Sequence, residues 1–137
     1  MDNRAPPWQG YDMPDRWRGR LRPDESGNIP VEAFNDFLAE HPDLARSPLR
    51  ATIEFAKLRD PNGLATIVRA RASGPESPDS VRVTLTEDDL PDDSVRSVRY
   101  VLRFRRAGRR WRVESARRTQ RCQRGRGHQR FSPRPCR

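Results

Sequence analysis

The stretch that decides the fold is residues 98–113, which read VRYVLRFRRAGRRWRV. Apolar and basic side chains alternate here, and a period of two is typical of a β-strand with one buried face. Ala107-Gly108 divides the stretch and supplies the turn of a hairpin. We predict that one face of this hairpin is mostly buried and that the arginines between its residues face solvent. That face consists of Val98, Tyr100, Leu102, Phe104, Trp111 and Val113, with Ser115 continuing the alternation.

Two more strands and two helices are predicted upstream of the hairpin. The strands alternate in the same way, with inward side chains at Val68, Ala70, Ala72, Val81, Val83 and Leu85. The first helix has Pro30 in its first turn, ends at Pro42, and has Val31, Phe34, Phe37 and Leu38 on one side. The second begins at Ser47-Pro48, an N-cap followed by proline at the first helical position, and ends at Asp60. Its apolar side is predicted to contain Leu49, Ile53, Phe55 and Ala56.

This order of elements predicts an α+β domain. Two helices are followed by a four-stranded antiparallel meander, and both helices pack on one face of the sheet. We place this domain at residues 29–120, after an irregular Pro-rich arm (1–28) and before a basic, Cys-bracketed tail (121–137). The other face of the sheet then carries rows of arginine, and like charges opposite one another cost about 0.2–1 kcal/mol per pair. We therefore expect an acidic group from the loop 87–93, the arm or a partner to lie against it.

The composition limits the classes of protein to consider. Of 137 residues 33% are hydrophobic, below the ~45–50% usual for globular domains, so the core is expected to be small. No apolar run is long enough to span a membrane, and residues 1–20 do not resemble a signal peptide. The compartment stays open: cytoplasmic as the chain is written, extracytoplasmic if a leader precedes Met1. Residues 101–137 hold 14 of the 28 basic residues and one acid, Glu114, within a formal net charge of +9.

Two resemblances follow from these patterns. Helices before an antiparallel meander whose late strand reads Gly108-x-x-Trp111-x-Val113 resemble the cone-shaped folds of the cystatin-like and nuclear transport factor two-like superfamily. The tail resembles the ending of uncharacterised bacterial proteins that close with Cys-x-x-Gly-Arg-Gly-His-Gln-x-(aromatic)-Ser and a final Cys. The matching residues are Cys122, Gly125, Arg126, Gly127, His128, Gln129, Phe131, Ser132 and Cys136. Such proteins often look exported or lipid-anchored, and the resemblance implies no biochemical activity.

The two cysteines, Cys122 and Cys136, bracket a loop rich in glycine and proline. We predict a disulfide between them, with Cα atoms roughly 4.4 to 6.8 Å apart. Closing a loop of this length stabilises the folded chain by roughly 3 kcal/mol in the chain-entropy model. The alternative is a pair of free thiols in a reducing cytosol. A zinc site is not expected, because zinc needs four ligands and only these cysteines, His128 and His41 are at hand.

Three functions remain open. The first is a non-catalytic domain of unknown ligand, and no metal or other cofactor is expected. The second is weak, salt-sensitive, sequence-independent binding of nucleic acid or another polyanion. Its candidate residues are Arg99, Arg103, Arg105, Arg110, Arg112, Arg124 and Arg126. The third is a pocket enzyme with Tyr100 as its inner polar group, but no catalytic motif is present and we name no catalytic residue. In the tail Gly125 and Gly127 are expected to bend the loop, and Arg126 and His128 can either bind a partner or bond back to carbonyl groups.

Overall fold

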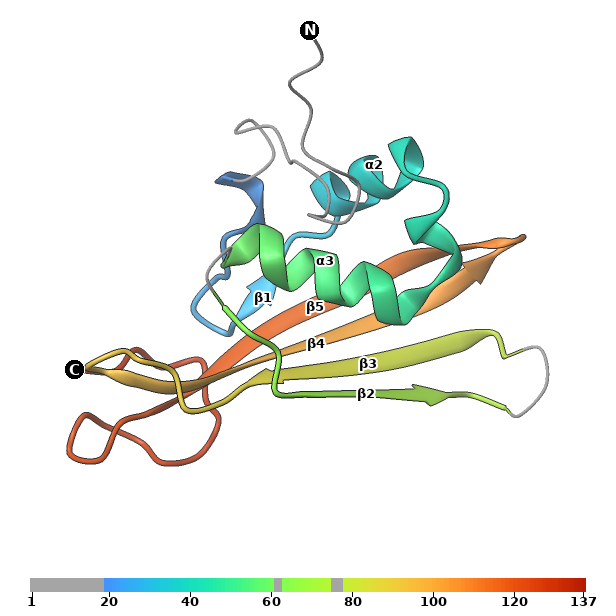
Figure 1. Cartoon of the computed structure of the whole chain (residues 1–137). Coiled ribbons are helices and arrows are strands. Elements are labelled where there is room, and N and C mark those ends of the chain that lie inside the picture. Colours follow the sequence, from blue (N-terminus) through green and yellow to red (C-terminus); the bar gives the residue numbers. More distant parts are fainter. Residues whose placement is uncertain (1–18, 61–62, 75–77) are drawn as a thin grey trace, which may run out of the picture.

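The computed structural model describes residues 19–60, 63–74 and 78–137, which form one antiparallel sheet with two helices on one of its faces (Figure 1). The helical elements are η2 (Gly19–Leu21), α2 (Glu32–Glu40), η3 (Leu44–Arg46) and α3 (Pro48–Arg59), where η marks a 3-10 turn. The strands are β1 (Asn28–Ile29), β2 (Ile67–Ala72), β3 (Ser80–Glu87), β4 (Val95–Ala107) and β5 (Arg110–Cys122). They lie in the order β1-β5-β4-β3-β2.

The predicted α+β class and both helices are confirmed. α3 begins where its sequence predicts, since the Oγ of Ser47 accepts a hydrogen bond from the Arg50 N–H at 3.2 Å and Pro48 takes the first helical position. Leu49 was wrongly placed on the buried side and is 41% exposed. The buried side of α3 follows Ala51, Phe55 and Leu58, and Leu49 lies to one side of that line.

The hairpin prediction is confirmed, because all six predicted inner residues are at most 8% exposed. Aromatic rings join the sheet to both helices: Phe55 meets Tyr100 edge-on at 5.8 Å between centroids, and Phe34 meets Phe55 at 5.0 Å. Phe34 also stacks on Phe37 at 5.7 Å. The core therefore lies between the helices and the β3–β5 part of the sheet, and the opposite face is left to solvent.

The sheet has five strands among the described residues, where the sequence predicted four. The missed strand is β1, whose Asn28 and Ile29 pair with Arg117 and Ala116 at the edge of β5. Asn28 falls inside the segment expected to be an irregular arm. A two-residue strand shows no alternation, so the sequence pattern could not identify it. Residues 19–27 of that expected arm are described, and they include η2, whose Leu21 is fully buried in the core. Residues 1–18 lie outside the described residues.

β5 is longer than predicted and changes face midway. The alternation was expected to place Ser115 inward and to end between Ser115 and Arg118. A register shift opposite Arg103 and Phe104 instead leaves Ser115 exposed and turns Ala116 inward. The strand then continues to Cys122, which is fully buried.

The two sides of the sheet are completed differently, at β2 and at the part of β5 that lies beyond β1. Of the inward residues predicted for β2, only Val68 packs against the core, and Ala70 and Ala72 are exposed because this edge strand is not covered there by any described helix. At β5 the side chain of Asn35 covers the strand edge. Its Nδ2 donates to the Val113 carbonyl and its Oδ1 accepts from the Val113 N–H, both at 2.9 Å. α2 is thereby fixed to the sheet by backbone-like hydrogen bonds.

Candidate anion-binding face

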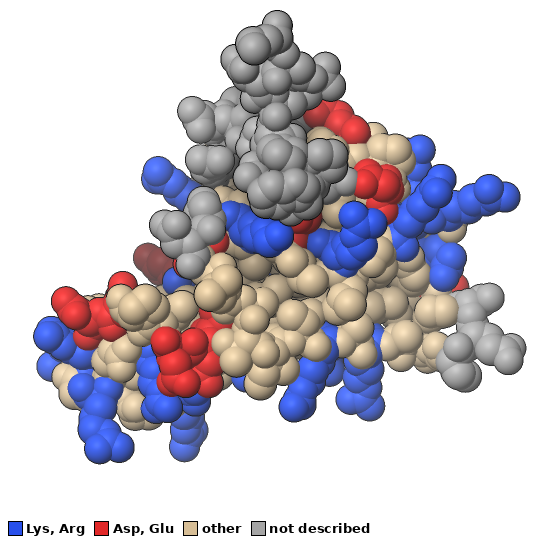
Figure 2. Space-filling view, in the orientation of Figure 1, with Lys and Arg blue, Asp and Glu red and all other residues tan. Residues whose placement is uncertain are grey.

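The face of the sheet turned away from the helices is basic, and we call it the arginine face. Cross-strand partners share a face of the sheet, so the register identifies its members. They are Arg69 and Arg71 on β2, Arg82 on β3, Arg99, Arg103 and Arg105 on β4, and Arg112, Arg117 and Arg121 on β5. Figure 2 shows basic side chains projecting from this side of the sheet.

Several of these arginines stand directly opposite one another. Arg71 pairs with Arg82 and Arg82 with Arg103, which makes one row of three guanidinium groups across β2, β3 and β4. Arg105 lies opposite Arg112. Each such pair is destabilising unless an anion lies between its members. The arrangement therefore lowers the stability of the free protein and favours anions on this face.

The acidic cover expected for this face is present at two places only among the described residues. Glu114 bonds Arg105 at 2.6 Å, and Asp88 bonds Arg121 at 2.7 Å. Five other arginines of this face form no ion pair and no side-chain hydrogen bond with the described residues: Arg69, Arg71, Arg82, Arg103 and Arg112. Most of the positive charge is thus left uncompensated within the described part of the chain.

Two neighbouring grooves run over four of these unpaired arginines, Arg69, Arg71, Arg82 and Arg103, whereas Arg112 lines neither. One, of about 530 Å³, is lined by Ile67, Arg69, Ala70, Arg71, Arg82, Thr84, Thr86 and Arg99. The other, of about 410 Å³, shares Arg71 and Arg82 with it and adds Arg103, Arg105 and Glu114. Guanidinium groups are planar, permanently charged and able to bind phosphate or carboxylate through two parallel hydrogen bonds. Both grooves therefore offer donors to an anionic chain.

The candidate residues chosen from the sequence are only partly brought together. Arg99, Arg103, Arg105 and Arg112 lie on the arginine face. Arg110 lines a separate depression beside α2, together with Asn35 and Trp111. Arg124 and Arg126 are exposed in the tail loop and line neither groove.

Sequence reasoning missed Arg69, Arg71 and Arg82 as candidate binding residues. Their alternation with Val68, Ala70 and Val83 is the same signal that selected Arg103. It also missed Phe131. This ring lies under the guanidinium of Arg99, with its centroid 3.9 Å from Cζ, and 5.3 Å from Cζ of Arg121. No local pattern in the sequence relates residues so far apart in the chain.

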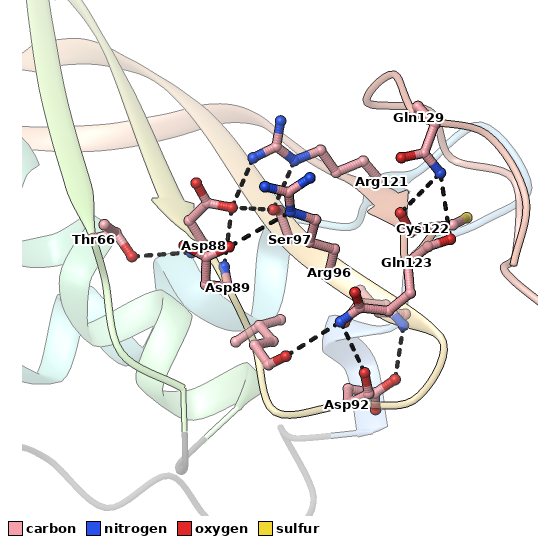
Figure 3. Close-up of polar contacts among 12 residues, drawn as sticks. Thr66, Asp88, Asp89, Asp92, Arg96, Ser97, Arg121, Cys122, Gln123 and Gln129 are labelled. Carbon is pink, nitrogen blue, oxygen red and sulfur yellow. Dashed lines mark hydrogen bonds and ion pairs between the residues drawn. The ribbon is translucent and has the colours of Figure 1, made fainter. Parts of the chain in front are cut away.

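The acidic loop between β3 and β4 is fixed to β5 at the end of the arginine face (Figure 3). Asp88 accepts from the Ser97 hydroxyl and from Nη2 of Arg121, and Ser97 in turn accepts from Nε of Arg121 at 2.7 Å. The hydrogen bond from Ser97, followed by that from Arg121, lowers the pKa of Asp88 to about 2. Asp88 therefore stays ionised at neutral pH, and Arg121 is neutralised by it.

The tail is an ordered loop closed by the predicted disulfide. Cys122 and Cys136 are bonded, with Cα atoms 5.5 Å apart, within the range expected. Gly125 and Gly127 both have positive φ, and a Cβ at Gly127 would lie 2.9 Å from the sulfur of Cys122. The ring nitrogens of His128 lie 2.7 and 2.9 Å from the carbonyl oxygens of Arg130 and Arg134. Thus Gly127 and His128 shape the loop itself.

The cysteines and His128 also bring their potential metal-binding atoms within 4.8 Å of one another. Both sulfur atoms are used in the disulfide, however, and zinc binds cysteine as the thiolate. In this oxidised state the cluster is a covalent tie and not a zinc site.

Among the described residues, the part of the inner face around Tyr100 and Glu87 offers little room for a substrate. Tyr100, the candidate polar group of a pocket enzyme, is 2% exposed, and burial raises its pKa despite nearby Arg118. Glu87 was expected in the loop 87–93 but ends β3 and is 2% exposed. Burial, followed by the charge of Asp60, raises its pKa to about 7. The cavity beside it is about 80 Å³, against roughly 300–1,000 Å³ for typical ligand pockets.

Within the described residues no helix is both long enough and apolar enough to cross a membrane. Comparison of the chain with known proteins found no matching family model, no matching curated protein and no matching solved structure.

Proposed function

We propose that this protein is a non-catalytic domain that binds nucleic acid or another polyanion through its arginine face. The observation that carries the proposal is the row Arg71–Arg82–Arg103, which has no acidic partner among the described residues. Arg71 and Arg82 line both grooves, and Arg103 lines the smaller one. An anionic chain laid along these grooves would separate like charges and make charge-assisted hydrogen bonds. Binding would then relieve a repulsion that the free protein carries.

The binding should be weak, indifferent to sequence and sensitive to salt. Arginines on a sheet face supply phosphate contacts, whereas sequence is read by contacts with base edges. Phe131, the aromatic ring that the described residues place at this face, packs against arginine and is not presented as a free stacking platform. Affinity would therefore come mainly from the counterions that the arginines release.

The disulfide supports an oxidising compartment as the place of action, because such bonds persist outside the cytosol and are rare within it. In that setting the partner would be an extracytoplasmic polyanion. The element order, with both helices before the meander, also supports our proposal of a cystatin-like cone fold.

Titration of a labelled oligo-dT, a random duplex and heparin at about 50 and about 200 mM NaCl tests the proposal. The variant carries Arg71→Ala, Arg82→Ala and Arg103→Ala. Its matched control carries Arg22→Ala, Arg46→Ala and Arg50→Ala, three exposed arginines outside the sheet. On nucleic acid each lost contact should reduce the slope of log affinity against log salt by about 0.7–0.9. Equal losses in both variants would show that net charge alone is responsible, and tight binding at high salt would indicate a specific reader.

A further inference from the structure

We propose that Arg99, held between Thr86 and Phe131, is the anchoring oxyanion site of the arginine face, and that the C-terminal motif serves to place Phe131 there. This inference rests on the proposed function. It identifies one binding subsite, Arg99, and the tail segment that holds its side chain in place. Its ligand is a single oxyanion group, such as a phosphate, sulfate or carboxylate carried by the polyanion.

Arg99 is ordered in a way that leaves its binding edge open. Its Nε donates to Oγ1 of Thr86 at 3.2 Å, and its Cζ lies over the ring of Phe131, 3.9 Å from the ring centroid. Its terminal nitrogens form no hydrogen bond or ion pair with the described residues. Stacking uses the face of the plane, whereas an oxyanion binds to the N–H groups at its edge. The two interactions are therefore compatible at one side chain.

The second arginine on the same ring is not available in this way. Arg121 donates from Nε to Ser97 and from Nη2 to Asp88, both at 2.7 Å. Its charge is neutralised by a carboxylate that stays ionised. Of the two guanidinium groups that meet Phe131, only Arg99 can offer an uncompensated charge to a ligand.

The position of Phe131 is set by the backbone on both sides of it. Ser132 makes two hydrogen bonds with Gln120, at 2.9 and 3.0 Å, as an isolated bridge at the edge of β5. The two ring nitrogens of His128 lie within hydrogen-bonding distance of the carbonyl oxygens of Arg130 and Arg134, which flank Phe131 in the chain. The disulfide closes the segment to β5. These contacts of the tail motif fix the backbone of the loop. The side chain that the loop places against the sheet is that of Phe131.

The surroundings of Arg99 fit the anchoring of one end of an anionic chain. Arg99 lines the larger groove, and Arg69, Arg71 and Arg82 line the same groove farther along β2 and β3. An ordered arginine loses less side-chain freedom on binding than a free one, so the same hydrogen bonds give higher affinity at this position. A first anionic group at Arg99 would direct the next ones onto the row Arg71–Arg82–Arg103.

The test compares variants that change the charge at Arg99 with variants that change how firmly its side chain is held. Phe131→Leu keeps the net charge and most of the apolar volume but removes the aromatic face. Arg99→Ala removes the anchoring group, and Arg50→Ala removes the same charge from the exposed side of α3. The probes are oligo-dT, heparin and inorganic polyphosphate, so that phosphate and sulfate sources are distinguished. The Nε–H signal of Arg99, identified by its loss in Arg99→Lys, reports the stacking and its response to each probe.

We expect Arg99→Ala to weaken binding roughly tenfold, as the loss of charge-assisted hydrogen bonds implies. Phe131→Leu should weaken it about two- to fivefold, the worth of one cation–π contact, with an unchanged salt slope. Reduction of the disulfide should weaken binding by wild type but add little to Phe131→Leu, because both changes act through the same ring.

The inference is overturned if wild type binds while Phe131→Leu equals wild type and Arg99→Ala equals Arg50→Ala. That result would leave the proposed function intact and remove only the anchoring site. If wild type binds none of the probes at low salt, the proposed function and the subsite both fail.

Discussion

At the scale of single residues, Glu87 is the clearest conflict between burial and charge. Neither oxygen of its carboxylate has a hydrogen-bond partner among the described residues, and Gly63 packs so closely that a Cβ there would lie 1.7 Å from Oε2. Burial and Asp60 hold its pKa at about 7 in the folded chain, against 4.5 for the ordinary group. Glu87 therefore favours the protonated form when the chain is folded.

The consequence is a loss of stability with rising pH. Below pH 4.5 Glu87 is protonated in both the folded and the unfolded chain and costs nothing; between 4.5 and about 7 the unfolded chain releases the proton first. Above pH 7 the folded chain bears the full cost of the buried charge. Glu87→Gln should raise the free energy of unfolding near pH 8 by about 1–3 kcal/mol and change it little near pH 4. Urea unfolding at both pH values measures this.

Glu25→Gln, a change at an exposed position, is the control and should show no such difference. Asp88 gives a contrast of opposite sign, since its lowered pKa of about 2 means that its contribution is lost as pH falls from 3.8 through 2. A Glu87→Gln protein that is less stable than wild type near pH 8 would show that the carboxylate is compensated by a group outside the described residues.

Substitution of the two tail glycines, Gly125 and Gly127, distinguishes the cost of an unfavourable backbone conformation from the cost of a steric clash. Both have positive φ, but nothing lies within 4 Å of a Cβ built at Gly125, whereas one at Gly127 would lie 2.9 Å from the sulfur of Cys122. Either change to alanine should cost about 1 kcal/mol for the backbone. Gly127→Ala should cost about 1–2 kcal/mol more, because the disulfide must shift. Thermal unfolding of both variants gives the comparison, and equal losses would mean that the sulfur moves aside freely.

At the scale of elements, the sequence predicted what depends on repeated local pattern. The hairpin and both helices were found because six alternating residues and a Ser47-Pro48 cap are local signals. β1 was missed because two residues show no period, and the bulge was missed because it depends on register with the partner strand. The contact of Phe131 with Arg99 is set by a loop that leaves the sheet and returns to it, which no local pattern encodes.

The tail loop allows a direct test of what the disulfide contributes. Cys136→Ser should lower the free energy of unfolding by roughly 3 kcal/mol under oxidising conditions, since the unfolded chain is no longer constrained. Under reducing conditions the variant and wild type should unfold at nearly the same temperature. Differential scanning fluorimetry with and without reductant measures both. An unchanged midpoint in both conditions would mean that hydrogen bonds such as Ser132–Gln120 hold the loop unaided.

At the scale of the whole molecule, the face of the sheet away from the helices carries mainly positive charge. Basic side chains project from this face (Figure 2). Among the described residues, acids meet its arginines at two places, Glu114 at Arg105 and Asp88 at Arg121. The positive charge of this face therefore has opposite effects on folding stability and on the binding of an anion. Repulsion among the arginines destabilises the folded chain, and the same potential attracts an anionic partner.

Salt should therefore move these two properties in opposite directions. Raising NaCl from about 20 to about 300 mM screens the repulsion and should raise the unfolding midpoint of the free protein by a few degrees. Over the same range polyanion affinity should fall. The variant with alanine at 71, 82 and 103 should show a flatter response in both measurements, because the row Arg71–Arg82–Arg103 is gone. The control with alanine at 22, 46 and 50 loses equal net charge and should keep most of both responses. If the two variants respond alike, the repulsion belongs to the net charge of +9 and not to the arginine face.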